Sequence, residues 1–88
     1  MDQKPLGKVE HYYPKAHAAV VRVEHGSLCV GDQIHIAGAG DDFWEEVTSL
    51  EMDHKPVQKA HTGEAVGLLV EHRVHEGAEV FKLDALEG

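Results

Sequence analysis

The sequence lacks several features on which common protein classes depend. It has a single cysteine, Cys29, which excludes an internal disulfide and a cysteine-rich zinc module. Its uncharged runs are far shorter than the roughly 20 residues that a membrane-spanning helix needs. The polar start, residues 1–5, has no apolar stretch of the kind found in signal peptides. We therefore expect a soluble, cytoplasmic protein that has no membrane contact.

Positive charge is scarce as well. Eight lysines and arginines stand against sixteen aspartates and glutamates, so the formal net charge is −8. Proteins that bind duplex DNA normally carry a surplus of positive charge, because phosphate neutralisation supplies much of their affinity. Nonspecific nucleic-acid binding is therefore disfavoured, whereas a local RNA contact through a small basic or stacking patch stays open.

Helical periodicity is also missing, and short strand-like stretches stand in its place. Residues 33–36 alternate polar and apolar side chains, and residues 65–70 form an apolar run typical of a buried strand. In the stretch 43–52 the apolar positions change parity, which predicts a bulge or bend near residues 48–49. The turns recur at a spacing typical of an all-β domain of about six or seven strands. Because closure removes exposed sheet edges, we predict a small closed six- to seven-stranded antiparallel β-barrel.

The length of 88 residues allows one domain, which we place over residues 1–88. Its core is expected over about residues 7–83. We expect frayed ends at residues 1–5 and 84–88, as is usual for chain termini.

A nucleotide site is not expected, although Gly26 and Gly31 have the spacing of a phosphate-binding loop. That loop next needs lysine and then serine or threonine, whereas Asp32 and Gln33 follow here. The Asp32 carboxylate would repel a triphosphate. The segment is better explained as a tight turn into the next strand, and we expect no nucleotide and no cofactor.

The eight histidines match no common metal-site spacing. His75 has no second histidine four residues on, and His11 and His17, which could meet across a turn, are the best pair available. Dispersed surface histidines are the simpler interpretation, so no metal site is expected. Neither Cys29 nor the two serines lies in the signature of a nucleophile, so we do not expect an enzyme.

An acidic stretch, residues 41–53, holds six acids and no lysine or arginine. It can be a solvated strand face or a patch for a basic partner protein. Trp44 points outward if Phe43 points inward, because neighbouring strand residues face opposite sides. An exposed tryptophan can anchor a contact, stack on a base, or cap the open end of a barrel. The residues assigned to protein docking are Asp41, Asp42, Trp44, Glu45 and Glu46.

Read in order, several segments resemble the second domain of translational GTPases, the elongation factor Tu type of β-barrel. The most specific block joins Ser-Leu-Glu-Met, residues 49–52, with Ala-x-x-Gly-Glu-x-Val-Gly-Leu, residues 60–68. Residues 47–70 also resemble the small barrel that is appended to some collagenase-like peptidases and RNA-modifying relatives. The blocks span about Gly7 to Lys82, nearly the whole chain, and are Gly7 to Val9, Leu28 to Ile34, Val47 to Met52, His54-Lys55, Ala60, Gly63 to Leu68 and Glu76 to Val80.

The resemblance implies a barrel fold and an RNA contact. In elongation factor Tu this domain contacts the aminoacyl end of tRNA, and in several relatives it contacts ribosomal RNA. The resemblance places Glu64, preceded by Gly63, where tRNA-binding members carry an acid or amide near the terminal adenosine. It places Glu51, His54 and Lys55 at the neighbouring strand end. The sequence carries no GTPase domain, so GTP hydrolysis is not expected of it.

We therefore expect a non-catalytic, translation elongation factor-like module that contacts RNA or a ribonucleoprotein. The alternative is an accessory protein-docking module of a peptidase-like or RNA-modifying enzyme, which uses the acidic face. A small metal-binding protein is a further alternative.

Overall fold

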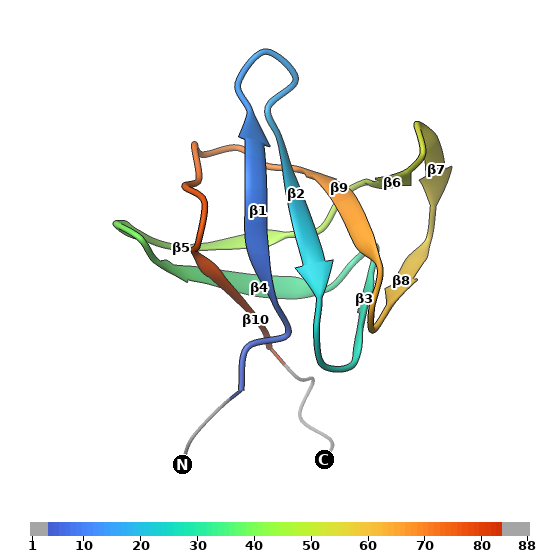
Figure 1. The fold of residues 1–88 in the computed structure, drawn as a ribbon, viewed down its shortest axis with the longest axis horizontal. Helices are drawn as coiled ribbons and strands as arrows, with labels where there is room; N and C mark the ends of the chain where they lie inside the picture. Colours follow the sequence, from blue (N-terminus) through green and yellow to red (C-terminus); the bar gives the residue numbers. More distant parts are fainter. Residues whose placement is uncertain (1–3, 84–88) are drawn as a thin grey trace.

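The computed structural model describes residues 4–83, which form ten β-strands and no helix (Figure 1). The all-β prediction is confirmed. None of the described residues forms a helix long and apolar enough to cross a membrane. The expected fraying at 1–5 and 84–88 falls largely outside the described residues. The strands are β1 (Gly7–Tyr13), β2 (Ala18–Val23), β3 (Ser27–Cys29), β4 (Gln33–Gly38), β5 (Asp41–Glu46), β6 (Leu50–Met52), β7 (Lys55–Val57), β8 (Lys59–His61), β9 (Ala65–Leu69) and β10 (Glu79–Lys82).

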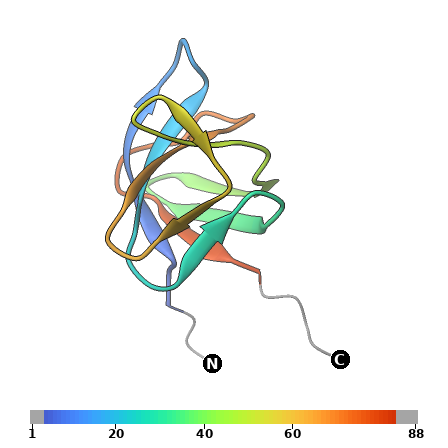
Figure 2. The same ribbon diagram turned by 90° about the vertical axis from the view of Figure 1, so that its right-hand side faces the viewer.

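The predicted closed barrel of six or seven strands is wrong in strand number and in closure. Eight strands form one antiparallel sheet in the order β5-β4-β10-β1-β2-β9-β6-β7, and β3 pairs with β8 in a separate sheet. Closure would require β5 to pair with β7, and both remain sheet edges. The strands instead curl around a shared core, as the two views together show (Figure 2).

One of the additional strands has a local cause at Val47. Its N–H donates to the Asp32 carbonyl (2.8 Å) at the end of the β4–β5 ladder, and the chain then leaves that ladder. Three residues later Leu50 pairs with Leu68 of β9. The predicted bend near residues 48–49 is thus a complete break between β5 and β6.

The core is built from one face of each long strand. On β2, for example, Ala19, Val21 and Val23 are fully buried, and the residues between them are not. β1 packs so closely on β2 that a Cβ atom added at Gly7 would collide with the Arg22 carbonyl. The largest fully buried side chains are Leu28, Ile34, Ile36, Leu50, Leu68, Val9, Val21, Val23, Val47, Val66, Val74 and Val80.

Candidate docking site

β5 carries acids on both of its faces. Asp41 and Glu45 are buried, with 8% and 9% of their surface exposed, whereas Asp42 and Glu46 are exposed. Trp44, on the same face as Asp42 and Glu46, is 55% exposed. The acidic stretch is therefore not a single solvated face.

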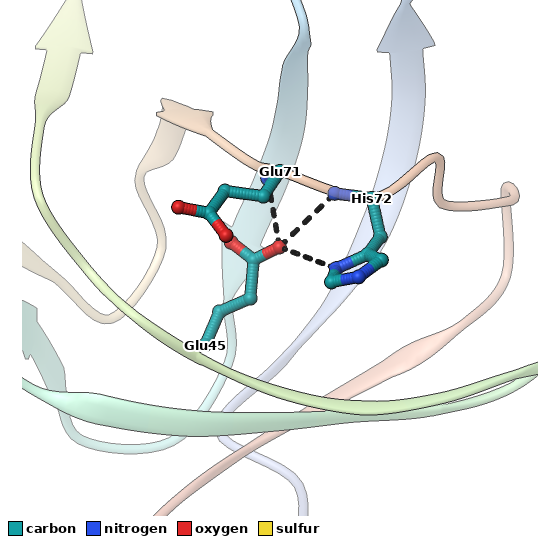
Figure 3. A network of polar contacts seen from close by, with 3 residues as sticks. All are labelled: Glu45, Glu71 and His72. Atoms are coloured by element: carbon teal, nitrogen blue, oxygen red, sulfur yellow. Dashed lines mark hydrogen bonds and ion pairs between the residues drawn. The ribbon is translucent and has the colours of Figure 1, made fainter.

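The two buried carboxylates hold residues 71–75, which connect β9 to β10, against the sheet. Glu45 Oε2 accepts the N–H groups of Glu71 (2.8 Å) and His72 (3.2 Å), and His72 Nδ1 lies 3.4 Å from the same oxygen (Figure 3). Asp41 Oδ2 accepts the N–H of His75 (2.7 Å), and Asp41 Oδ1 lies 2.8 Å from His75 Nδ1. These contacts offset the cost of burying the carboxylates. Both side chains are thereby occupied inside the molecule.

The outer face of β5 presents a fixed aromatic surface. The Trp44 ring stacks on His35 of β4, with a centroid distance of 4.5 Å and an interplanar angle of 11°. His35 is held in turn by Asp42, whose Oδ1 lies 2.7 Å from His35 Nε2. The Trp44 side chain thus projects from the outer face of the sheet, and its stacking on His35 fixes its orientation. A fixed, exposed ring of this kind suits a contact anchor or a stacking surface.

A groove of about 470 Å³ opens beside this aromatic surface; we call it the Trp44 groove. Its lining includes the exposed Leu69 and the acidic residues Glu45, Glu46 and Glu71, but no lysine or arginine. The carboxylate of Glu45 is already bound to residues 71 and 72, so Glu46 and Glu71 supply the negative charge of the groove. An apolar and acidic lining of this kind suits a ligand that carries both apolar and positively charged groups. The lining residues are His17, Gln33, Trp44, Glu45, Glu46, Thr48, Leu69, Val70 and Glu71.

The residues assigned to RNA do not all come together. Glu51 and His54 line a second, largely apolar groove of about 530 Å³, the His54 groove, and Lys55 follows at the start of β7. Gly63 and Glu64 lie in the turn before β9 and line neither groove. There the Glu64 carboxylate accepts the N–H of His61 (2.7 Å) and so stabilises the turn.

The turn between β6 and β7 has an unusual conformation. Asp53 and His54 both have positive φ angles, 53° and 64°. Two-residue hairpin turns of this type normally use Asn-Gly or Asp-Gly, because glycine adopts positive φ without steric cost. His54 therefore carries some backbone strain at the edge of its groove, and strained residues often lie at functional sites.

Residues 17–79 match the sequence model of elongation factor Tu domain 2. The chain belongs to this family. An uncharacterized protease of Methanocaldococcus jannaschii is 38% identical over 79 residues, which make up 89% of this chain and 19% of that protein. Elongation factor 1-alpha of Archaeoglobus fulgidus is 45% identical over 51 residues, which make up 58% of this chain and 12% of that protein. The chain thus spans a fifth or less of these curated relatives.

Solved structures share the fold of this chain. Two crystal structures of the C-terminal domain of a U32 peptidase-like protein from Geobacillus thermoleovorans match with TM-scores of 0.83 and 0.84. The matches cover 91% and 92% of this chain, and 100% and 93% of the solved chains, at 19% identity. At this identity the likeness shows the fold. The family resemblance predicted from the sequence is confirmed.

Four histidine side chains lie against carboxylates: His11, His35, His72 and His75. From the sequence, His11 and His17 were the best candidate pair of metal ligands. In the structure His11 contacts a carboxylate instead, because its Nδ1 lies 2.9 Å from Glu76 Oε2. Within residues 4–83, no three histidine, cysteine, aspartate or glutamate side chains are grouped as metal ligands would be.

Among the surface ion pairs, the hydrogen bond and charge of Glu10 raise the pKa of Arg22.

Two features of the docking site were missed from the sequence. The inward placement of Asp41 and Glu45 could have been found, because the alternation that turns Trp44 outward turns its odd-numbered neighbours inward. The opposite wall of the groove, Leu69 and Glu71, gave no local signal, since it lies about 25 residues further along the chain.

Proposed function

We propose that the chain is a non-catalytic accessory domain that docks on the catalytic part of a U32 peptidase-like enzyme, in the cytoplasm. One observation carries the proposal: the chain matches the separately solved C-terminal domain of such a protein over 91% of its own length and 100% of that domain. The relative described as a protease supports it, because the shared stretch is only 19% of that protein.

The site geometry supports protein docking. Interfaces concentrate their binding energy in a few aromatic and apolar anchors that are surrounded by a polar rim. Trp44 and Leu69 are exposed apolar groups at one groove, and the carboxylates of Glu46 and Glu71 border them. Of the five residues assigned to docking, Asp42, Trp44 and Glu46 are available at the surface.

RNA contact, the leading expectation from the sequence, has weaker support. The His54 groove is lined by two acids, Glu51 and Asp53, and by no lysine or arginine. Carboxylates repel phosphates, and phosphate contacts supply much of the affinity for nucleic acids. We keep RNA contact as an outcome of the experiment.

The test is a titration of this chain into a U32 peptidase-like enzyme from which its own C-terminal domain has been deleted. The deleted domain, which crystallised as a separate domain, serves as the positive control when it is added back. We expect a one-to-one complex by calorimetry, unchanged after nuclease treatment, that competes with the positive control. The proposal is overturned if the control binds and this chain does not, or if this chain binds only when RNA is present.

A further inference from the structure

One long edge of β5 has no neighbouring strand among residues 4–83, because β5 ends the eight-stranded sheet. In an antiparallel pair, successive residues turn their backbone N–H and C=O groups alternately toward and away from the partner. The Val47 N–H donates to the Asp32 carbonyl across the β4–β5 ladder. The backbone groups of Glu45, two residues before Val47, therefore also point toward β4. Those of Trp44 and Glu46 point to the free edge.

This free edge borders the Trp44 groove at its C-terminal half, residues 44–46. Trp44 and Glu46 form one wall of the groove, and Leu69 and Glu71 form the other. Residues 71–75 do not add a strand to β5, because they are bound through the side chains of Asp41 and Glu45 rather than through backbone pairing. An extended segment lying along β5 would therefore meet backbone groups that no strand of residues 4–83 pairs with, and beside Trp44 and Glu46 it would meet an apolar, acidic groove.

We propose that β5 binds an extended, basic segment of a partner protein by adding it to the sheet as the next strand. Strand addition of this kind takes affinity from backbone hydrogen bonds and specificity from alternate side chains. Glu46 and Glu71 provide the negative charge, and a lysine or arginine of the segment can lie over the exposed ring of Trp44. The inference rests on the proposed docking function and names the chemistry of its partner.

Charge selects this occupant over two others. A second copy of the chain would pair β5 with itself, and the antiparallel arrangement of Asp-Asp-Phe-Trp-Glu-Glu places acids opposite acids. A nucleic-acid strand would bring phosphates to the same carboxylates. The formal net charge of −8 favours a basic partner in the approach of the two molecules as well.

The test uses a seven-residue peptide of alternating lysine and valine with acetylated and amidated ends. Trp44 is the single tryptophan of the chain, so its fluorescence reports on the site. We expect a saturable change in emission and slowed hydrogen exchange at the amides of Trp44 and Glu46. A peptide with glutamate in place of lysine should not bind.

Backbone methylation separates strand addition from simple charge attraction. Two versions of the peptide carry N-methyl groups on alternate residues, one set facing β5 and the other facing solvent. The facing set should weaken binding at least about tenfold, which corresponds to about 1.4 kcal/mol, and the solvent set should leave it nearly unchanged. Equal affinity of the two methylated peptides would overturn the inference, as would slowed exchange at β7 instead of β5.

Matched variants test the charge contribution. Glu46→Lys should weaken binding of the lysine peptide about fivefold or more. Glu24→Lys is an equal charge change at an exposed position after β2, and it should leave binding unchanged. If the truncated enzyme binds while the Trp44 and Glu46 amides stay unprotected, the strand-addition inference fails and docking stands. If the peptide adds to β5 but the enzyme does not bind, the docking proposal fails instead.

Discussion

β5 and β7 end the same eight-stranded sheet, but they differ in length and in backbone chemistry. β7 has three residues, Lys55-Pro56-Val57, and its proline has no N–H to offer a new strand. Short length, lysine and proline are the usual protections of an exposed edge. β5 has six residues and neither lysine nor proline. The β7 edge thus offers little backbone to an added strand, whereas among residues 4–83 the β5 edge carries acidic side chains in place of these protections.

Protection by charge is selective in a way that protection by proline is not. Acidic side chains repel another acidic strand and attract a basic one, so an acidic edge disfavours pairing with itself and favours a basic strand. The inner acids contribute differently, because Asp41 and Glu45 fix residues 71–75 and stabilise the edge strand from the core side. Substitutions test whether these inner acids differ in their effects from the outer acids, Asp42 and Glu46.

The largest expected effect is at an inner acid. Glu45→Ala removes the acceptor of two backbone N–H groups and leaves them poorly satisfied, so the free energy of unfolding should fall by about 2–4 kcal/mol. Glu45→Gln keeps one side-chain oxygen and should lose less. Glu46→Ala, on the exposed face, should change stability by no more than about 0.5 kcal/mol. Urea denaturation measures all three, and equal losses for Glu45→Ala and Glu46→Ala would show that burial does not distinguish these acids.

The next effect concerns self-association through β5. The double substitution Asp42→Asn with Glu46→Gln removes the outer charges and keeps side chains of similar size. We expect the association constant of the dimer to rise at least about tenfold, because unpaired edges associate when charge no longer prevents it. Glu24→Gln with Glu51→Gln removes the same charge elsewhere and serves as the control. Sedimentation equilibrium decides, and a monomeric double variant at millimolar concentration would contradict charge protection of this edge.

The sequence predicted those features of the fold and of the candidate site that depend on neighbouring residues. Alternation over residues 33–36 and around Trp44 was sufficient to predict strands and the outward tryptophan. The pairing of β3 with β8 joins Leu28 to Ala60, and no local pattern specifies such a distant partner. Closure likewise depends on whether the two edges meet, which is a property of the whole sheet. The groove was missed for the same reason, since its walls come from distant strands.

No effect is expected with nucleic acid. A 3′-terminal CCA oligonucleotide should leave the amide resonances of β5 unchanged, because the edge is acidic. We also expect no saturable shift at the His54 groove below millimolar RNA. Saturable shifts confined to residues 51–55 and 63–67 in a magnetic-resonance titration would instead support the RNA hypothesis and would weaken the docking proposal.

The smallest change in stability is expected in the two turns that lead into the edge strands. Ala39, before β5, and His54, before β7, both have positive φ angles, 55° and 64°, where L-residues are strained by roughly 1 kcal/mol or more. Glycine relieves this strain but adds freedom to the unfolded chain, which costs about 0.5–1 kcal/mol. Asparagine tolerates the conformation without the full entropic cost. We therefore expect Ala39→Asn and His54→Asn each to raise the free energy of unfolding by about 0.5 kcal/mol in urea denaturation. A loss of stability with His54→Asn alone would show that contacts of the imidazole in its groove outweigh the backbone strain, and would distinguish this edge of the sheet from the other.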